Sequence, residues 1–206
     1  MAGEVTTWKG VEIPRVLPGL SFDEANHKYT LNGKPLKGVT YYTGKLRDHS
    51  FCKPEDLAWG SAVHDHLYAL DMGTLDWSRL DPRMSPYIKG WQWVLESNGW
   101  RTDRMLAEQT VYSIKYWLAG RFDRLFETEK YDVLVDFKSG APDKVTGLQL
   151  AAYAMMAVEL KWTTPARVRL VEVCIDMEGH VKQQQFSYKA ELPFFMMQYS
   201  LSNHIN

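Results

Sequence analysis

The stretch "GRFDRLFETEKYDVLVDFKSG", residues 120–140, decides the predicted fold. In its second half apolar residues recur at every second position, which predicts a strand over 131–138 with one apolar face. The segment before it predicts another strand over 117–127. A turn centred between Glu129 and Lys130 would join the two strands into an antiparallel hairpin.

The register of this hairpin follows from its apolar face, because the packing of buried side chains fixes which residues lie opposite each other. The turn sets four apolar residues in two opposed pairs, Phe122 with Phe137 and Phe126 with Val133. The same register sets Asp123 opposite Asp136 on the other face. Carboxylates placed in this way have Cβ atoms about 5 Å apart, and their like charges destabilise the sheet unless something neutralises them.

The two acids therefore predict a divalent cation, since hard carboxylate oxygens suit Mg²⁺ or Mn²⁺. Lys138 projects to the same face as Asp136, and we expect it to stabilise negative charge that develops at a phosphate. A turn near residues 115–116 would set Glu108 of the preceding strand opposite Asp123. The alternative is a surface hairpin with solvated charges, which is disfavoured because the register follows from the apolar face and not from the acids.

The rest of the chain alternates helical and extended patterns. The sequence predicts helices over 54–70, 85–100, 146–160 and 190–204, and strands over 106–114, 166–176 and 181–188. Within 27–40, the dipeptide Asn32-Gly33 predicts a hairpin with a type I′ turn. A helix, three strands, a helix and a strand in this order predict an α/β fold with a central mixed sheet flanked by helices.

The composition fits a globular protein of one domain, with 206 residues, 45% hydrophobic residues and a net charge of -1. We expect a single domain over 1–206, with an N-terminal hairpin elaboration over 1–50 and a core over 51–206. The two cysteines, Cys52 and Cys174, form no CxxC pair, which argues against a zinc ribbon or an iron–sulfur cluster. The sequence contains neither a signal peptide nor a long apolar run, so we expect an intracellular, cytoplasmic protein.

Five short motifs follow one another on the expected helices and strands. They are Gly60 to His64 in "GSAVH", Glu108 in "AEQT", Gly120 to Asp123 in "GRFD", Asp136 and Lys138 in "DFK", and Gln149 to Tyr153 in "QLAAY". In this order they resemble the RecB-type branch of the PD-(D/E)XK nuclease superfamily. The resemblance spans 60–153 and implies a restriction-endonuclease-like core, written αβββαβ, that cleaves DNA.

The resemblance also implies a role for each motif residue. The metal ligands it implies are His64, Asp123, Asp136 and the carbonyl of Phe137. Lys138 would be the catalytic lysine, and Glu108 would support a second ion or its water. Gln149 and Tyr153 lie four residues apart on one helix face, where they would line the active site and position DNA.

Side chains outside the motifs add further expectations. Arg121 and Arg124 are candidates for contacts with DNA phosphates. Trp91 continues the apolar stripe of its helix and is expected in the core. Trp93 lies off that stripe, so we expect it to be exposed and available for stacking on a base.

Together these features predict an Mg²⁺- or Mn²⁺-dependent deoxyribonuclease. The chain resembles small stand-alone enzymes of bacteriophages and of mitochondrial DNA maintenance, which favours an exonuclease in phage DNA recombination, repair or processing. A structure-specific or nicking endonuclease of the same fold and a non-catalytic nucleic-acid-binding protein remain alternatives. The "HDH" at 64–66 also suggests an all-helical phosphohydrolase, which the predicted strands disfavour. Expected partners are DNA and a single-strand annealing or single-strand-binding protein, without a membrane.

Overall fold

The computed structural model describes residues 5–23, 26–47 and 53–204. The helices are α1 (Val39–Thr43), α2 (Pro54–Asp71), α3 (Ser85–Asn98), α4 (Thr146–Glu159) and α5 (Tyr188–His204). The strands are β1 (Val5–Trp8), β2 (Val11–Pro14), β3 (Leu20–Asp23), β4 (Lys28–Leu31), β5 (Lys34–Gly38), β6 (Met105–Ser113), β7 (Leu118–Glu127), β8 (Asp132–Lys138), β9 (Val168–Ile175) and β10 (Val181–Phe186). Every helix and strand predicted after residue 53 is present, with bounds that differ by at most two residues. Cys52 lies outside the described residues.

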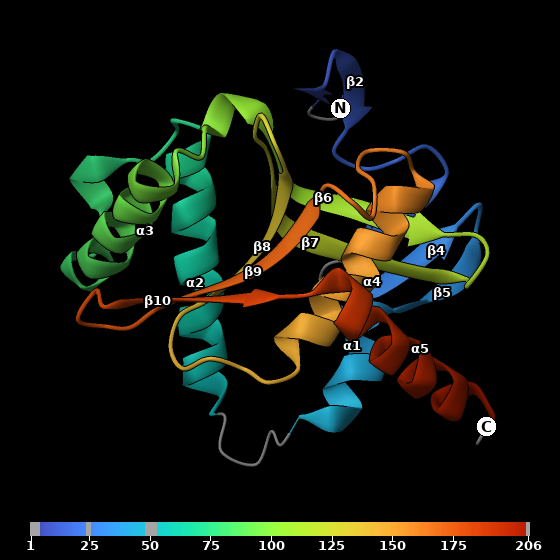
Figure 1. Ribbon diagram of the computed structural model, residues 1–206. Helices are drawn as coiled ribbons and strands as arrows, with labels where there is room; N and C mark the ends of the chain where they lie inside the picture. The colour runs from blue at the N-terminus through green and yellow to red at the C-terminus, as the bar shows by residue number, and fades with distance from the viewer. Residues whose placement is uncertain (1–4, 24–25, 48–52, 205–206) are drawn as a thin grey trace.

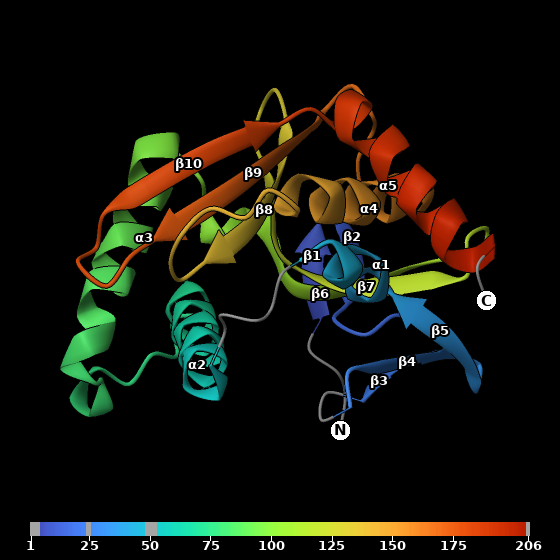
Figure 2. The same cartoon turned by 90° about the horizontal axis from the view of Figure 1, so that it is seen from below.

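One mixed sheet forms the centre of the fold, with the strand order β10-β9-β8-β7-β5-β4-β3 and with β6 also paired to β7. Strands β6, β7 and β8 are antiparallel, whereas β9 runs parallel to β8. Helices α2 and α3 lie on one side of this sheet, and α4 and α5 lie on the other (Figures 1 and 2). The predicted α/β architecture, a central mixed sheet flanked by helices, is therefore confirmed.

The sheet separates two apolar cores. Alternate residues of β8 enter different cores: Leu134 packs with α4, whereas Val135 and Phe137 pack beneath α2 and α3. Trp91 of α3 is fully buried in the second core, as predicted. Trp93, two residues later, is 55% exposed, which confirms that it lies off the apolar stripe.

The predicted register of the central hairpin is confirmed for Phe126 with Val133. The predicted pair of Phe122 with Phe137 is not formed, because Phe122 packs in the core beneath α4 and Phe137 in the core beneath α2 and α3. The ladder between β7 and β8 runs only as far as the pair of Arg124 with Val135. Asp123 and Asp136 therefore follow one residue beyond the last backbone pair. At this point the two strands no longer share backbone hydrogen bonds, and side chains can reach the space between them.

The N-terminal segment extends the central sheet. Strands β4 and β5 form the predicted hairpin, and Asn32 and Gly33 have the positive φ angles of a type I′ turn, 50° and 77°. Strand β5 then pairs in parallel with the start of β7. The four-residue strands β1, β2 and β3 were not predicted, because so few residues carry little periodicity.

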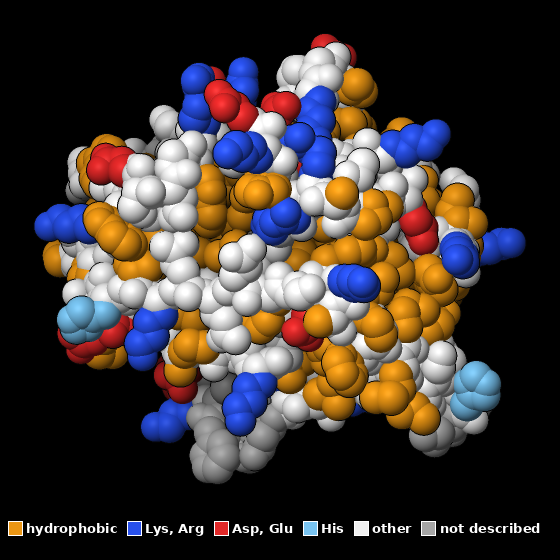
Figure 3. Space-filling model, viewed as in Figure 1, with side chains coloured by type: hydrophobic (Ala, Val, Ile, Leu, Met, Phe, Trp, Pro, Cys, Tyr) orange, Lys and Arg blue, Asp and Glu red, His pale blue; other side chains and the backbone are white. Residues whose placement is uncertain are grey.

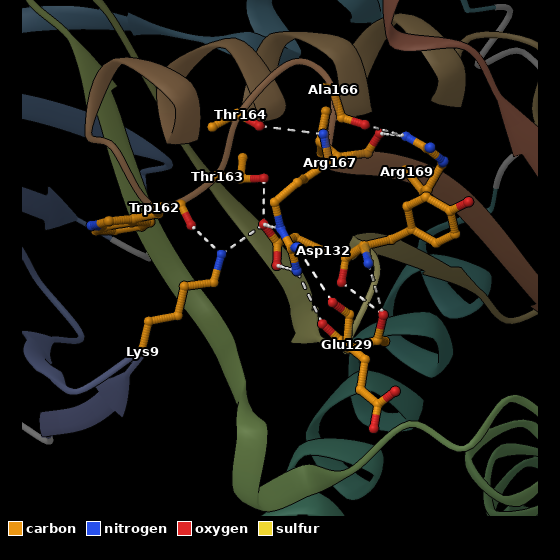
Figure 4. A network of polar contacts seen from close by, with 12 residues as sticks. Lys9, Glu129, Asp132, Trp162, Thr163, Thr164, Ala166, Arg167 and Arg169 are labelled. Carbon is orange, nitrogen blue, oxygen red and sulfur yellow. Dashed lines mark hydrogen bonds and ion pairs between the residues drawn. The ribbon is translucent and has the colours of Figure 1, made fainter.

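A buried carboxylate links the first residue of β8 to the turn between β1 and β2. Asp132 is fully buried and accepts hydrogen bonds of 2.7 Å from Lys9 and from Thr163 (Figure 4). The Arg167 guanidinium lies 3.4 Å from the same oxygen. These contacts hold in place the strand that ends in Asp136 and Lys138.

Charged side chains of both signs are interspersed over the face shown in Figure 3. Exposed apolar side chains also occur, among them Phe194, Met197 and Leu201 of α5. Of the helices in the described ranges, none combines the length and the apolar character that a membrane crossing requires.

Candidate active site

Most of the predicted site residues meet in one cleft of about 760 Å³. The cleft is lined by residues of α1, α2 and α4, of β4, β6 and β7, and of the end of β8 with the loop that follows it. Those predicted from the sequence are His64, Glu108, Arg121, Asp123, Lys138, Gln149 and Tyr153. Two predicted residues do not line it: Asp136, which is buried next to it, and Arg124.

Helix α2 brings His64 to the sheet, and Gly60 lets it come close. A Cβ atom on Gly60 would lie 3.3 Å from the Oγ atom of Ser139, which follows β8 directly. One turn later, His64 Nδ1 lies 3.6 Å from Asp123 Oδ2. The His64 ring stands edge-on against Phe137, with ring centroids 5.2 Å apart. The glycine and the histidine of the first motif thus serve one contact between α2 and the end of β8.

Three candidate metal ligands converge in the cleft. Ligand atoms of His64, Glu108 and Asp123 all lie within 4.8 Å of one another. Burial would raise the pKa of Asp123, but the charges of His64, Arg124 and Lys138 and a hydrogen bond from the Phe137 N–H lower it overall. Asp123 is therefore ionised at neutral pH. Two carboxylates and an imidazole in this arrangement fit a divalent cation such as Mn²⁺ or Mg²⁺.

Asp136 lies next to this cluster and is turned towards Lys138. It is 3% exposed, and its Oδ1 accepts a hydrogen bond of 3.3 Å from Gln149 Nε2. Its Oδ2 lies 2.5 Å from Lys138 Nζ but has no hydrogen bond of regular geometry. Burial raises the pKa of Asp136, and the Lys138 charge opposes this rise. A buried carboxylate oxygen without a regular hydrogen bond fits the neighbourhood of a cation.

Lys138 carries a positive charge at the edge of the cleft. Burial alone would lower the pKa of its ammonium, but Asp136 and Asp123 raise it above the ordinary lysine value. A charged ammonium cannot accept a proton at neutral pH. In the metal-free protein Lys138 is therefore a charged hydrogen-bond donor at the cleft.

Glu108 has an unusual backbone conformation in the middle of β6. Its φ of 46° lies in the left-handed region, which costs a non-glycine residue about 1–3 kcal/mol. The register predicted for β6 and β7 holds on both sides of it, where Ala107 faces Arg124 and Gln109 faces Phe122. The predicted position opposite Asp123 is thus correct, although Glu108 itself has no backbone partner there.

The Glu108 carboxylate is held between opposing charges. Burial and the negative charge of Asp123 raise its pKa to about 7, against the lowering effect of Arg124 and Arg121. Arg121 Nε lies 3.3 Å from Glu108 Oε2, and Arg124 Nη1 lies 3.4 Å from Glu108 Oε1. Glu108 can therefore exchange a proton near neutral pH when no cation is present.

The expectation that Arg124 contacts DNA is wrong. Its side chain is fully buried, and its Nε lies 2.8 Å from Asp71 Oδ2 at the end of α2. Asp71 also accepts a 2.8 Å hydrogen bond from the indole of Trp91. A phosphate cannot reach this guanidinium, which instead links α2 to Glu108. Arg121 does line the cleft, as expected for a residue that meets a phosphate.

Gln149 and Tyr153 project together from α4. Gln149 Nε2 donates to Tyr153 Oη over 3.1 Å, and both side chains line the cleft. The Tyr153 ring lies against Gly120, where a Cβ atom would come within 2.4 Å of it. The glycine of one motif thus makes room for the tyrosine of another.

Arg47 joins this group but belongs to none of the motifs. Its Nη2 donates a 2.7 Å hydrogen bond to Gln149 Oε1. No pattern around Arg47 indicated the contact, because Gln149 is 102 residues away in the sequence.

Comparisons with known proteins identify the family of the chain. A family model described as the PD-(D/E)XK nuclease superfamily matches residues 39–199. Among solved structures, the crystal structure of SSO0001 shares 14% identity at a TM-score of 0.41, over 80% of this chain and 75% of that chain. No curated protein sequence matches. The family match covers more than half of the residues, and the chain belongs to the PD-(D/E)XK nuclease superfamily, whose members use divalent metals to cleave nucleic acids.

Proposed function

We propose that this protein is a divalent-metal-dependent deoxyribonuclease, most closely allied to the RecB-type branch, that degrades DNA from its ends. The observation that carries the proposal is the convergence of His64, Glu108 and Asp123 in one cleft, which Lys138 also lines. Lys138 forms an ion pair there with the buried Asp136. The resemblance of the motifs to small stand-alone nucleases of bacteriophages supports exonuclease action in recombination, repair or processing.

The side chains divide the work according to their charge and position. His64, Asp123 and Glu108 would hold the cation, with Asp136 close by. A divalent cation bound there supplies Lewis acidity and neutralises phosphate charge. Lys138 donates hydrogen bonds from a charged ammonium and stabilises the negative charge that develops on the phosphate oxygens. Arg121 would contact an adjacent phosphate from the wall of the cleft.

The proposal is tested by comparing a linear and a covalently closed circular DNA of one sequence, each with Mn²⁺ or Mg²⁺. We expect the linear DNA to be degraded to short products and the closed circle to survive. Asp123→Asn should abolish cleavage, whereas Asp103→Asn, which alters an exposed acid paired with Arg101, should not. Rapid loss of closed circles would instead support an endonuclease. Binding of DNA without cleavage under any of these conditions would support the non-catalytic alternative.

A further inference from the structure

Arg47 follows the short 3₁₀ turn Gly44–Leu46, between α1 and α2, and reaches across to α4. Its Nη2 donates to Gln149 Oε1 over 2.7 Å, and its Nε lies 2.5 Å from Asp143 Oδ2. We propose that Arg47 is a positioning residue that fixes the orientation of the Gln149 amide and, through it, the Asp136 carboxylate. This inference rests on the proposed nuclease function.

The hydrogen bonds of Arg47 fix which end of the Gln149 amide faces Asp136. A guanidinium has donors and no acceptor, so it can bond only the oxygen end of the Gln149 amide. The NH₂ end must then point the other way, where it donates to Asp136 Oδ1 over 3.3 Å and to Tyr153 Oη over 3.1 Å. A flipped amide would place its oxygen against the Asp136 carboxylate and its NH₂ against the guanidinium. Both contacts would be repulsive.

Because Gln149 and Asp136 are buried, a wrong orientation of the Gln149 amide would be costly. Gln149 is 7% exposed and Asp136 is 3% exposed, so little water is available to replace a lost hydrogen bond. A buried polar group without a partner costs about 1–3 kcal/mol. With Oδ1 held by Gln149, the other oxygen of Asp136 faces the Lys138 ammonium at 2.5 Å. Arg47, acting through Gln149, thus determines how Asp136 and Lys138 face each other.

The guanidinium is itself held in place. Asp143, its ion-pair partner, accepts a 2.9 Å hydrogen bond from the Val145 N–H, and its own N–H donates over 3.0 Å to the buried Glu172. The loop before α4 is therefore anchored on both sides of Asp143. A fixed carboxylate leaves Arg47 few alternative orientations.

Arg47 acts through Gln149 and not on DNA. The cleft is lined by Gln149 but not by Arg47, whose side chain is 18% exposed. A residue that bound a phosphate directly would have to present its guanidinium to the cleft. The two roles make different kinetic predictions, since a substrate contact changes KM and a positioning contact changes kcat.

The experiment measures kcat and KM for linear DNA with Mn²⁺ in Arg47→Met, Gln149→Leu and the double variant. We expect each single variant to lower kcat by about 10–100-fold, the range found when a residue behind a metal site is lost, and to leave KM within about threefold. The double variant should be no worse than Gln149→Leu. Arg47→Lys should restore part of the rate, because an ammonium also donates only to the amide oxygen. The control Arg101→Met, which removes an arginine from an exposed ion pair, should match the wild type.

Two results would overturn the inference. A rise in KM at unchanged kcat in Arg47→Met would make Arg47 a substrate contact. Losses that multiply in the double variant would show that Arg47 does not act through Gln149. Should Arg47→Met fail to fold, Arg47→Lys carries the same comparison, since it keeps a cation next to Asp143.

A second readout separates this inference from the proposed function. The side-chain NH₂ of Gln149 gives amide NMR signals that Gln149→Leu identifies by their loss. In the metal-free wild type we expect slow exchange with solvent, and at least tenfold faster exchange in Arg47→Met. If the wild type cleaves no DNA, the proposed function fails while this measurement still tests the positioning role. If the wild type cleaves DNA but the exchange rate does not change, the positioning role fails alone.

Discussion

The buried carboxylate of Glu108 should make the metal-free protein less stable as the pH rises. The pKa of Glu108 is about 7 in the folded protein, against an ordinary value of 4.5. The folded state therefore binds this proton more tightly than the unfolded state does. Below pH 4.5 both states are protonated and nothing is lost. Between about 4.5 and about 7 the unfolded chain releases the proton first, and stability falls with rising pH. The difference corresponds to about 3 kcal/mol, lost in full above pH 7. Since the side chain is only 12% exposed, solvent screening reduces this value little.

Glu108→Gln removes this titration while keeping the size of the side chain. The assay is urea unfolding of the metal-free protein, with a chelator present, at several pH values from 4 to 8. We expect the free energy of unfolding of the variant, minus that of the wild type, to grow by about 3 kcal/mol over this range. Titrating groups that do not interact with Glu108 cancel in the difference, and Glu129→Gln, a change at an exposed residue, serves as the control. A difference that does not change with pH would refute the view that Glu108 is held protonated by burial and by Asp123.

Two further predictions concern the charged groups of the cleft. Lys138→Ala should lower kcat by about 100-fold or more while Mn²⁺ and DNA binding stay nearly intact. Lys138→Arg should restore only part of the rate, because a planar guanidinium places its charge differently from an ammonium. Near-wild-type turnover of Lys138→Ala at saturating Mn²⁺ would contradict this role. Asp123→Asn should lose most of its Mn²⁺ affinity in calorimetric titration. The variant should unfold at nearly the wild-type urea concentration, since its amide oxygen can still accept the 2.7 Å hydrogen bond from the Phe137 N–H. Unchanged Mn²⁺ affinity would rule out Asp123 as a ligand.

The sequence predicted the central strands and their register because those features depend on local periodicity and on apolar pairing. The register that sets Glu108 opposite Asp123 needed only a turn position and the side-chain alternation of two strands. The left-handed backbone of Glu108 could not be predicted, because a positive φ is uncommon at a glutamate and no local pattern indicates it.

The burial of Arg124 was not predictable for a related reason. Its partner Asp71 lies 53 residues earlier, on a helix whose polar face gave no sign of an inward contact. A charged residue in a strand beside a proposed metal ligand is consistent with either a phosphate contact or a buried ion pair. Only the packing of α2 against the sheet decides between them, and the same holds for the contact of Arg47 with Gln149.

The glycine of the first motif gives a last prediction, which needs no change in any ligand. Gly60 sets how closely α2 approaches the end of β8, since a Cβ atom there would lie 3.3 Å from Ser139 Oγ. Gly60→Val adds further atoms on this side, so we expect α2 to move away and to carry His64 from its position 3.6 Å from Asp123. Mn²⁺ affinity should fall about tenfold or more, on the scale found for residues behind metal ligands. Ser139→Gly in the same chain should restore part of it by returning the space. If Gly60→Val binds Mn²⁺ as tightly as the wild type, the approach of α2 does not set the geometry of the ligands.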